Sequence, residues 1–478
     1  MTRPLILFDL TRLVSASGRS APTGIERVEL AYAKWLHGLD CADVRFVVTM
    51  QSVRMIADAA VPHFLDRQEA VWDSGAQGFS AESAILNVNE FLAGDGAPTA
   101  PRLGYLSKEE RELRRSRRGI TGEQPSRSPI ASWAQHMSAS WAREPLAPVL
   151  RQTHRERPVI YLRASLDRLE RPAPIERIKA FPGVRMVNVC HDLIPLDFPE
   201  FVRPGTATTC AARVETLAKH ADGIIASSHY SAARLRQYLG PKPPKISVSH
   251  IGSEPTRQDA VLPPLVDEPY FLVVSTIEAR KNHMLLLNVW RRLVEDMGYA
   301  APKLIIAGKR GWEAQTPIAV LDRVRQLSSH VYEAGAVPDA ALDLLRRKAT
   351  AVLMPSFVEG FGMPVTEALA VDTPVIASDI PVFREIVGDA AELIDPLDGP
   401  SWRQAVIDYA QKDSPRRAAA LEKARRYEPP QWSDHFRDVR NFIEEVGQVQ
   451  PKVFVPARRR RPAFPIGLLG ASPSRTLL

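Results

Sequence analysis

The stretch "TAVLMPSFVEGFGMPVTEALA", residues 350–370, carries the pattern from which we predict the fold. A short apolar run, typical of a buried strand, leads into a loop that contains Gly360 and Gly362. Pro364 then stands where the first turn of a helix accepts proline, and a helix-like tail follows. The strand–loop–helix order is the repeating unit of a parallel α/β sheet, and such sheets bind ligands at the carboxyl ends of their strands.

The same alternation continues on both sides of this stretch. Apolar runs such as "YFLVVST", "KLIIAG" and "PVIAS" alternate with segments of helical period in the second half. The first half begins in the same way, with "PLILFDLTRLV", a loop rich in Ser and Gly, a helical segment and "VRFVVTM". The Pro-rich run "VLPPLVDEP" separates the halves. We therefore predict an α/β protein with domains over residues 1–260 and 261–447. An irregular insertion is expected at about 70–155 and a disordered basic tail over 448–478.

Composition places the chain among ordinary globular proteins. It has 478 residues, of which 45% are hydrophobic and 24% charged. No apolar run approaches the roughly 18 residues of a membrane-spanning helix. The amino terminus lacks the features of a signal peptide, so we expect a cytoplasmic protein. Cys41, Cys190 and Cys210 match neither a disulfide framework nor a zinc site, which predicts free or buried thiols.

The net charge of +7 suits an anionic partner such as nucleic acid, a membrane surface or a phosphorylated substrate. Arginine runs occur at residues 108–119 and 458–461. They lack interleaved aromatic residues and match no nucleic-acid-binding module, so we expect no nucleic acid as partner. The tail segment "PARRRRPAFPIGLLG" joins arginines to apolar residues. It is either a solvated tail or a peripheral contact with the inner face of the anionic cytoplasmic membrane.

Charged residues in the second half suggest a diphosphate site. Arg280 and Lys281 follow the strand "YFLVVST", and two adjacent cations in such a turn suit a diphosphate. The helix start after Gly362 also favours an anion. Glu359 and Glu367 flank that start, and we place Glu367 in the first helical turn. Carboxylates beside a diphosphate are best used as acceptors for the hydroxyls of a ribose or a sugar. The alternative is that both glutamates only cap a helix.

These residues carry a resemblance to a known family. "EGFGMPVTEALA" resembles the E-x7-E signature of the retaining GT-B glycosyltransferases of family 4. "STIEARKN" is similar to the phosphate-binding turn of that family, and "EAGAVPDAALDLLRRKATAVLMPS", with Val337, to its base-contacting segment. The resemblance covers the second half in order. The first half matches more loosely: "FDLTRLVSASGRSAPTGIERV" resembles the Gly-containing loop that places Gly24 near the donor, although Thr23 departs from the pattern.

The resemblance implies a GT-B fold, in which two Rossmann-like domains face each other across a cleft. The domain over residues 1–260 would mainly bind the acceptor, and the domain over residues 261–447 would bind the nucleotide-sugar. Arg280 and Lys281 would stabilise the departing diphosphate, Glu359 would orient the sugar hydroxyls and Glu367 would hold the ribose. The sugar would also receive backbone N–H groups from Gly360, Phe361 and Gly362. "VCHDLIPLDFPE" is similar to the stretch that supplies a histidine to the sugar, here His191; a structural role is the alternative. The chain contains no Asp-x-Asp motif, so we expect neither a metal nor a cofactor.

The implied reaction is transfer of a sugar, with retention, from a UDP- or GDP-linked donor to an acceptor hydroxyl. The acceptor would be a glycan or a lipid-linked glycan in the synthesis of bacterial surface polysaccharide or lipopolysaccharide. We name no general base, because the leaving phosphate is expected to take the acceptor proton. Two other functions stay open: an inactive GT-B subunit that scaffolds polysaccharide synthesis, and a nucleotide-sugar epimerase. The sequence does not specify the sugar, the linkage or the oligomeric state.

Overall fold

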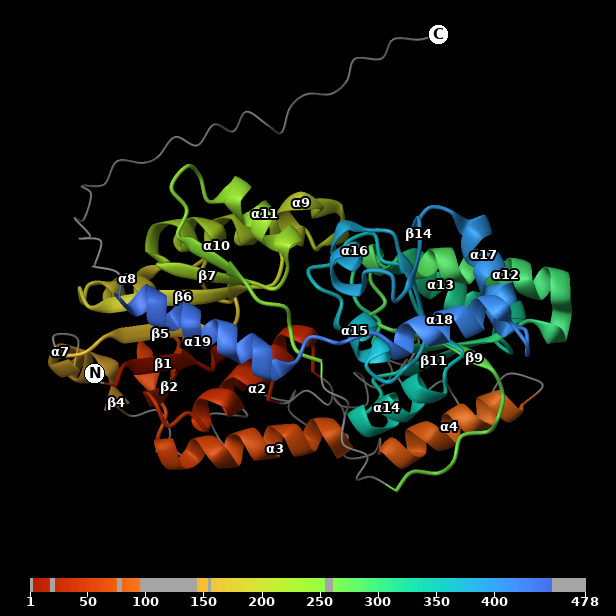
Figure 1. Ribbon diagram of the computed structural model, residues 1–478, viewed down its shortest axis with the longest axis horizontal. Helices are drawn as coiled ribbons and strands as arrows, with labels where there is room; N and C mark the ends of the chain where they lie inside the picture. The colour runs from red at the N-terminus through yellow and green to blue at the C-terminus, as the bar shows by residue number, and fades with distance from the viewer. Residues whose placement is uncertain are drawn as a thin grey trace, which may run out of the picture.

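The structure is a computed structural model that describes residues 3–17, 22–74, 80–94, 144–153, 156–253 and 261–448. The predicted basic tail and most of the predicted insertion lie outside these residues. Two lobes are visible in Figure 1, each built on one sheet. The fold class predicted from the sequence is therefore confirmed, with a largely parallel sheet in each half.

The first sheet has the strand order β4-β3-β2-β1-β5-β6-β7-β8. Its strands are β1 (Leu5–Asp9), β2 (Asp43–Thr49), β3 (Val53–Met55), β4 (Glu144–Pro145), β5 (Val159–Arg163), β6 (Val184–Cys190), β7 (Gly223–Ala226) and β8 (Lys245–Val248). Strands β3 and β4 are antiparallel at one edge and the others are parallel. The central strands are buried at every position, as expected where helices cover both faces of a parallel sheet.

The second sheet has the order β11-β10-β9-β12-β13-β14 and is parallel throughout. Its strands are β9 (Tyr270–Val274), β10 (Lys303–Ala307), β11 (Val331–Gly335), β12 (Ala351–Met354), β13 (Val375–Ser378) and β14 (Glu392–Ile394). Strand order reverses between β9 and β12, where the connections on either side lead to different faces. Ligands of open α/β sheets bind at such a switch point.

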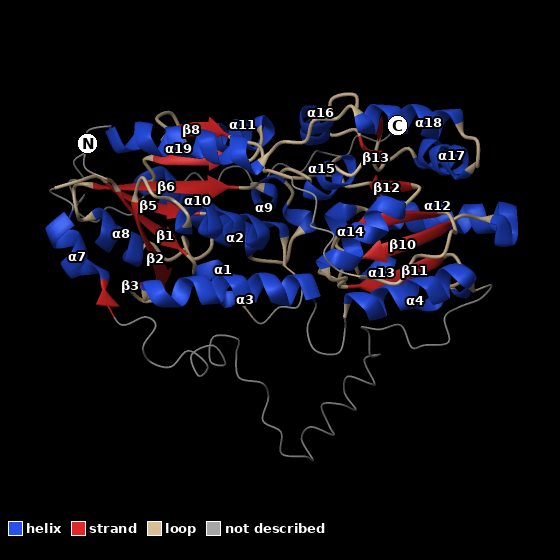
Figure 2. Cartoon of the chain, turned by 60° about the horizontal axis from the view of Figure 1, so that its bottom comes forward, coloured by secondary structure: helices blue, strands red, loops and turns tan. Residues whose placement is uncertain are grey.

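Helices connect the strands of each sheet (Figure 2). In the first half they are α1 (Thr11–Ser15), α2 (Gly24–His37), α3 (Val61–Ser74), α7 (Leu146–Thr153), α8 (Ala173–Lys179), α9 (Ile194–Asp197), α10 (Thr206–His220) and α11 (His229–Tyr238). In the second half they are α12 (His283–Met297), α13 (Gln315–Arg323), α14 (Asp339–Lys348), α15 (Met363–Leu369), α16 (Pro381–Val387), α17 (Gly399–Ala410) and α18 (Pro415–Arg425). Short 3₁₀ turns are η1 (Asp58–Ala60), η2 (Pro199–Phe201), η3 (Ala279–Lys281), η4 (Gly298–Ala300) and η5 (Arg325–Leu327).

Two helices pack against a different lobe from the one to which the predicted domain boundaries assign them. The last described helix, α19 (Trp432–Gln448), contacts β5, β6 and β7 of the first sheet, so the second domain does not extend to residue 447 as expected (Figure 1). Gly223 permits this contact, because a Cβ there would lie 2.8 Å from the Phe442 ring. Helix α4 (Ala81–Ala93) lies against α14 and β11 of the second half, where Lys303 donates to the Leu92 carbonyl at 2.5 Å.

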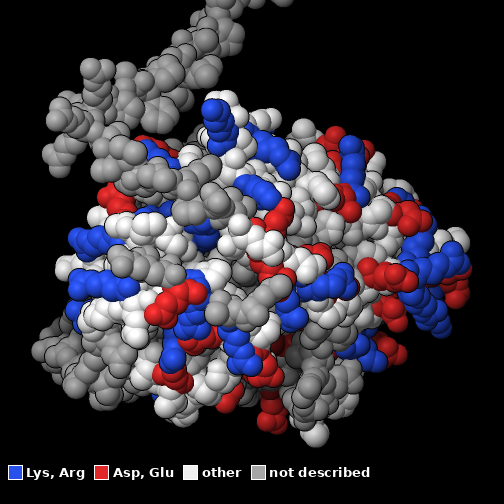
Figure 3. Space-filling view, turned by 60° about the vertical axis from the view of Figure 1, so that its left-hand side comes forward, with Lys and Arg blue, Asp and Glu red and all other residues white. Residues whose placement is uncertain are grey.

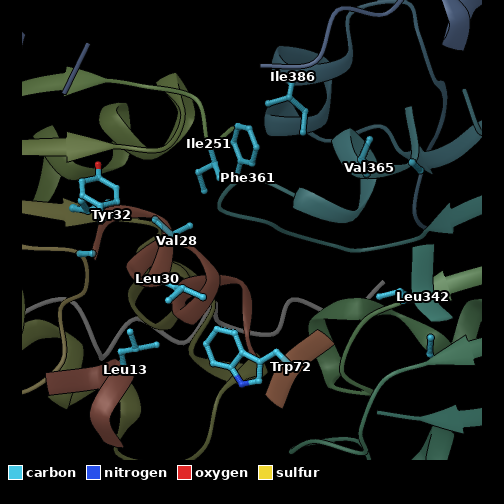
Figure 4. Packing of buried hydrophobic residues seen from close by; sticks show 14 of the residues in the cluster. Leu13, Val28, Leu30, Tyr32, Trp72, Ile251, Leu342, Phe361, Val365 and Ile386 are labelled. Carbon is cyan, nitrogen blue, oxygen red and sulfur yellow. The ribbon is translucent and has the colours of Figure 1, made fainter. Parts of the chain in front are cut away.

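Apolar packing joins the two lobes. One core cluster contains residues of both halves, and Figure 4 shows Ile251 of the first beside Phe361 of the second. Phe361 is 4% exposed, and burying a side chain of this size contributes about 1.5–3 kcal/mol. The two lobes are therefore in direct apolar contact at this junction.

One face of the surface and the helices of the described ranges bear on what a charged partner or a membrane would need. On the face shown in Figure 3, Lys and Arg side chains are interspersed with Asp and Glu. Within the described ranges, no helix combines the length and apolar character needed to cross a bilayer.

Candidate functional site

The site lies where the carboxyl ends of β9 and β12 face the first lobe. Because these two strands are neighbours in the sheet, the turn after β9 and the loop after β12 meet. The Phe357 N–H donates to the Arg280 carbonyl at 2.8 Å and joins the two segments through their backbones. The phosphate-binding residues and the first glutamate of the predicted site are therefore brought together.

Glu359 is the centre of this cluster and is 5% exposed. Arg280 donates to one carboxylate oxygen at 2.6 Å, while Lys281 and Ser356 donate to the other at 2.5 and 2.7 Å. Burial alone would raise the pKa of Glu359, but the charges of Arg280 and Lys281 and the hydrogen bonds hold it at about 2. Glu359 is thus ionised at neutral pH and its two oxygens are fixed in place.

The two cations differ in their surroundings. Arg280 also pairs with Glu278 at 2.8 Å, and its pKa is raised by its carboxylate partners against the opposing effect of burial. Burial and the neighbouring Arg280 lower the pKa of Lys281, although Glu359 opposes this. Burial raises the pKa of Glu278, and one of its carboxylate oxygens has no hydrogen-bond partner among the described residues.

Gly360 allows the two lobes to approach closely, and Gly362 allows the loop to pack on Phe383 of its own lobe. A Cβ at Gly360 would lie 2.5 Å from the His191 carbonyl oxygen and 2.8 Å from the Asp192 Cβ. Gly362 has φ +102°, a left-handed conformation, and a Cβ there would lie 2.4 Å from the Phe383 ring. Phe361 between them is buried in the shared core.

Helix α15 differs from the sequence expectation in one respect. It begins at Met363, with Pro364 in its first turn as predicted, so Glu367 lies in the second turn and not the first. The positive φ of Gly362 sets this start. Glu367 accepts a hydrogen bond from Arg346 of α14 at 2.8 Å and remains 21% exposed. Among the described residues, no donor is found for its other carboxylate oxygen.

His191 directly follows β6 on the first lobe. Its Nε2 lies 2.8 Å from the Ala164 carbonyl oxygen, so Nε2 carries the proton and Nδ1 is the acceptor. Burial lowers its pKa to about 4. The adjacent Asp192 is half-buried, and desolvation raises its pKa against the attraction of Arg280. Sequence reasoning named His191 and missed Asp192, although the pair "HD" at a strand end was the available signal.

Three serines of the first lobe hold the glutamate loop, and sequence reasoning missed them. Ser228 donates to the Gly360 carbonyl at 3.0 Å, while Ser227 and Ser231 lie 3.3 Å from the same oxygen. The latter two also reach the His191 carbonyl at 2.9 and 3.0 Å. We call Ser227, Ser228 and Ser231 the serine clamp. Its only sequence signal was "ASSHYS", a serine-rich turn after a strand.

The remaining predicted residues flank this centre. Gly24 begins α2, and a Cβ there would lie 3.4 Å from the Met363 sulfur, so Gly24 faces the start of α15 across the junction. Val337 is buried between β11 and α14, with 6% of its surface exposed. Among the described residues, no group of three or more His, Cys, Asp or Glu side chains is arranged to hold a metal ion. Metal independence stays a prediction.

Sequence comparisons match the second domain. Residues 256–427 match the family model of the glycosyl transferases group 1. The serotype-specific mannosyltransferase WbdA of Escherichia coli is 32% identical over 225 residues, which cover 42% of this chain and 27% of WbdA. The O-antigen chain mannosyltransferase B of Escherichia coli is 35% identical over 150 residues, which cover 31% of this chain and 39% of that protein. The matches thus span 27% and 39% of the length of these relatives.

Solved structures match over the whole chain. HepE of Anabaena, in complex with UDP and glucose, superimposes with a TM-score of 0.57 at 15% identity, covering 92% of this chain and 99% of HepE. Sucrose-phosphate synthase of Thermosynechococcus elongatus gives a TM-score of 0.53 at 13% identity, covering 93% and 99%. Such low identities show the fold alone. The chain therefore has the two-domain GT-B fold, and its residues 256–427 match the family model of the glycosyl transferases group 1.

Proposed function

We propose that this protein is a retaining glycosyltransferase that moves a sugar from a UDP- or GDP-linked donor to a hydroxyl of a glycan or lipid-linked glycan. The observation that carries the proposal is the buried cluster of Glu359, Arg280 and Lys281 at the switch point of the second sheet. Two cations and one carboxylate in contact suit a diphosphate and the hydroxyls of the sugar that it carries. The named relatives act on surface polysaccharide and support that setting.

The cluster would act on the leaving group. Charge develops on the departing nucleoside diphosphate, and the guanidinium and ammonium groups stabilise it where burial strengthens electrostatic interactions. Glu359, held by Ser356 as well as by the cations, keeps an ionised acceptor for sugar hydroxyls. The neutral His191 offers Nδ1 as an acceptor for a hydroxyl from the first lobe. The acceptor proton passes to the leaving phosphate, so no side chain is assigned as general base.

The experiment is a donor panel. Purified protein is incubated with UDP-glucose, UDP-galactose, UDP-N-acetylglucosamine and GDP-mannose, each with a mannoside or glucoside acceptor. Release of free nucleotide that depends on the acceptor supports the proposal, and an α-linked product seen by NMR supports retention. GDP-mannose is the first donor to test, because the relatives are mannosyltransferases. Absence of release with every donor, from protein whose fold is verified, would count against transferase activity.

Contact with an anionic membrane is a separate part of the proposal. The arginines of the segment 456–470 would be attracted to an anionic leaflet, by about 1 kcal/mol each. Sedimentation with anionic liposomes compares the full chain with one that ends at Gln450. Binding by the full chain alone supports the contact, and equal behaviour of both removes the tail from the proposal.

A further inference from the structure

A pocket opens between the two lobes. Its volume is about 650 Å³. Arg203 and Pro204 line it from the first lobe, and residues from Gly311 to Arg323, including Trp312, line it from the second. The Arg203 guanidinium lies 5.4 Å from the centre of the Trp312 ring. None of the residues assigned above to the donor contributes to the wall of this pocket.

Trp312 is presented to solvent by a loop that is otherwise tightly held. The Gly311 N–H donates to the Ile277 carbonyl at 2.8 Å, and a Cβ at Gly311 would lie 2.6 Å from the Thr276 side chain. Glu313 has φ +49°, a conformation that costs a non-glycine residue on the order of 1–3 kcal/mol. The backbone is thus fixed on both sides of Trp312. The indole nevertheless remains 37% exposed, which leaves an apolar ring available for contact.

A carboxylate of the pocket is also fixed. Arg310 has only 3% of its side chain exposed and donates to Glu333 at 2.7 Å and to Asp322 at 2.5 and 3.0 Å. The Asp322 carboxylate is 48% exposed on its other side and lines the pocket. A carboxylate accepts up to about four hydrogen bonds, so Asp322 retains acceptor capacity.

The charge balance of the wall argues for a neutral ligand. Arg203 and Arg323 oppose Glu313 and Asp322, so the pocket gives an anion no net attraction. The apolar lining residues are interspersed with these charged residues, which does not suit an acyl chain; they are Pro204, Trp312, Ala314, Ile318 and Ala319. A sugar ring fits what remains: its C–H face packs on an indole, and its hydroxyls bond to carboxylates and guanidinium groups.

The position of the pocket suits a ligand that is part of the acceptor. Gly311 is bonded to Ile277, three residues before Arg280 in the turn that carries the predicted phosphate contacts. Helix α13 packs against α12, whereas Glu367 pairs with Arg346 of α14, so the pocket and the expected ribose position use different elements. The wall from the first lobe comes from the domain expected to bind the acceptor.

We propose that the Trp312 pocket binds a neutral sugar unit of an extended glycan acceptor, at a distance from the unit that receives the transferred sugar. This inference rests on the proposed function and adds a preference for acceptors longer than one sugar. Trp312 is then a binding residue with no part in the chemical step.

Direct binding is the first test. Saturation-transfer NMR measures binding of α-mannotetraose and of maltotetraose to the full chain without donor. We expect at least one of them to bind, and Trp312→Ala to weaken that binding by about tenfold or more, which corresponds to ~1.4 kcal/mol. Trp312→Phe should retain most of the affinity, because it keeps an aromatic face. Tyr299→Ala is the matched control, since Tyr299 is an exposed aromatic residue of the same lobe that does not line the pocket.

Acceptor kinetics are the second test. Trp312→Ala should raise KM for the tetrasaccharide acceptor and leave kcat and the KM for a monosaccharide acceptor unchanged. Asp322→Ala should have the same effect in smaller degree and serves if Trp312→Ala does not fold. Failure of both tetrasaccharides to bind to the wild type, or equal binding by wild type and Trp312→Ala, overturns the inference. Absence of turnover with every donor overturns the proposed function, while the binding measurement still decides on the pocket.

Discussion

At the scale of single residues, Glu359 shows how much the sequence could predict. It follows β12 and the two cations follow β9, and carboxyl ends of neighbouring parallel strands meet at one edge. Their nearness was therefore predictable. The direct pairing of Glu359 with Arg280 and Lys281 was not, because it depends on side-chain positions in a buried space. A bound diphosphate would compete with Glu359 for the same two cations.

Glu359→Gln tests this arrangement. The amide keeps the size of the side chain and removes the charge that fixes Arg280 and Lys281. We expect kcat to fall by about 10²-fold, as loss of one preorganised electrostatic group does elsewhere, with a smaller change in donor KM. Acceptor-dependent nucleotide release measures both. Glu422→Gln, an exposed glutamate on α18, is the control. Unchanged kcat in Glu359→Gln would show that the cluster is not the reaction centre.

Arg280 and Lys281 also bear on metal dependence. If these cations stabilise the leaving diphosphate, EDTA should leave turnover almost unchanged, whereas Arg280→Ala should lower kcat by about 10²-fold or more. The two measurements use the same nucleotide-release assay. Complete loss of turnover in EDTA, restored by Mg²⁺ or Mn²⁺, would contradict the expected mechanism.

At the scale of elements, local patterns located strands and helices but not their partners. The start of α15 was shifted by the positive φ of Gly362, which moved Glu367 to the second turn. The serine clamp could not be predicted from the sequence, because residues 227–231 contact Gly360 only where the two lobes pack together. The sequence shows where the glycines are, and the structure adds which groups lie close to each of them.

Gly360→Ala tests the docking of the glutamate loop. The added methyl group would lie 2.5 Å from the His191 carbonyl oxygen, so the loop and the first lobe must separate. Misplacement on the scale of 1 Å can cost about 10²-fold in rate, so we expect kcat to fall at least about tenfold. Gly38→Ala is the control, because a Cβ there would meet only ordinary contacts at 3.8 Å. Equal kcat in the two variants would show that close docking is not needed for turnover.

At the scale of the whole molecule, the chain crosses between the lobes more often than a two-domain division of the sequence implies. Helices α4 and α19 are amphipathic, and periodicity identifies such helices without telling which sheet they cover. His435 attaches α19 to the first lobe. Its ring nitrogens lie 2.9 Å from the Tyr32 hydroxyl and 2.9 Å from the Ser249 hydroxyl. The stability of the first lobe therefore depends on residues at the far end of the described chain.

His435 should make this stability depend on pH. Burial lowers its pKa to about 4, whereas an unfolded histidine titrates near its ordinary pKa of about 6.5. Between these values the unfolded state binds a proton that the native state does not, so the free energy of unfolding falls as pH drops from about 6.5 towards 4. At a pH of about 5, His435 therefore lowers the free energy of unfolding by about 2 kcal/mol.

Urea unfolding of the wild type, compared at pH about 7.5 and about 5, should show this loss. In His435→Gln the difference between the two pH values should shrink by about 2 kcal/mol, whereas His63→Gln, at an exposed position of α3, should leave it unchanged. An equal loss in the wild type and in His435→Gln would show that acid weakens the molecule elsewhere than at the attachment of α19.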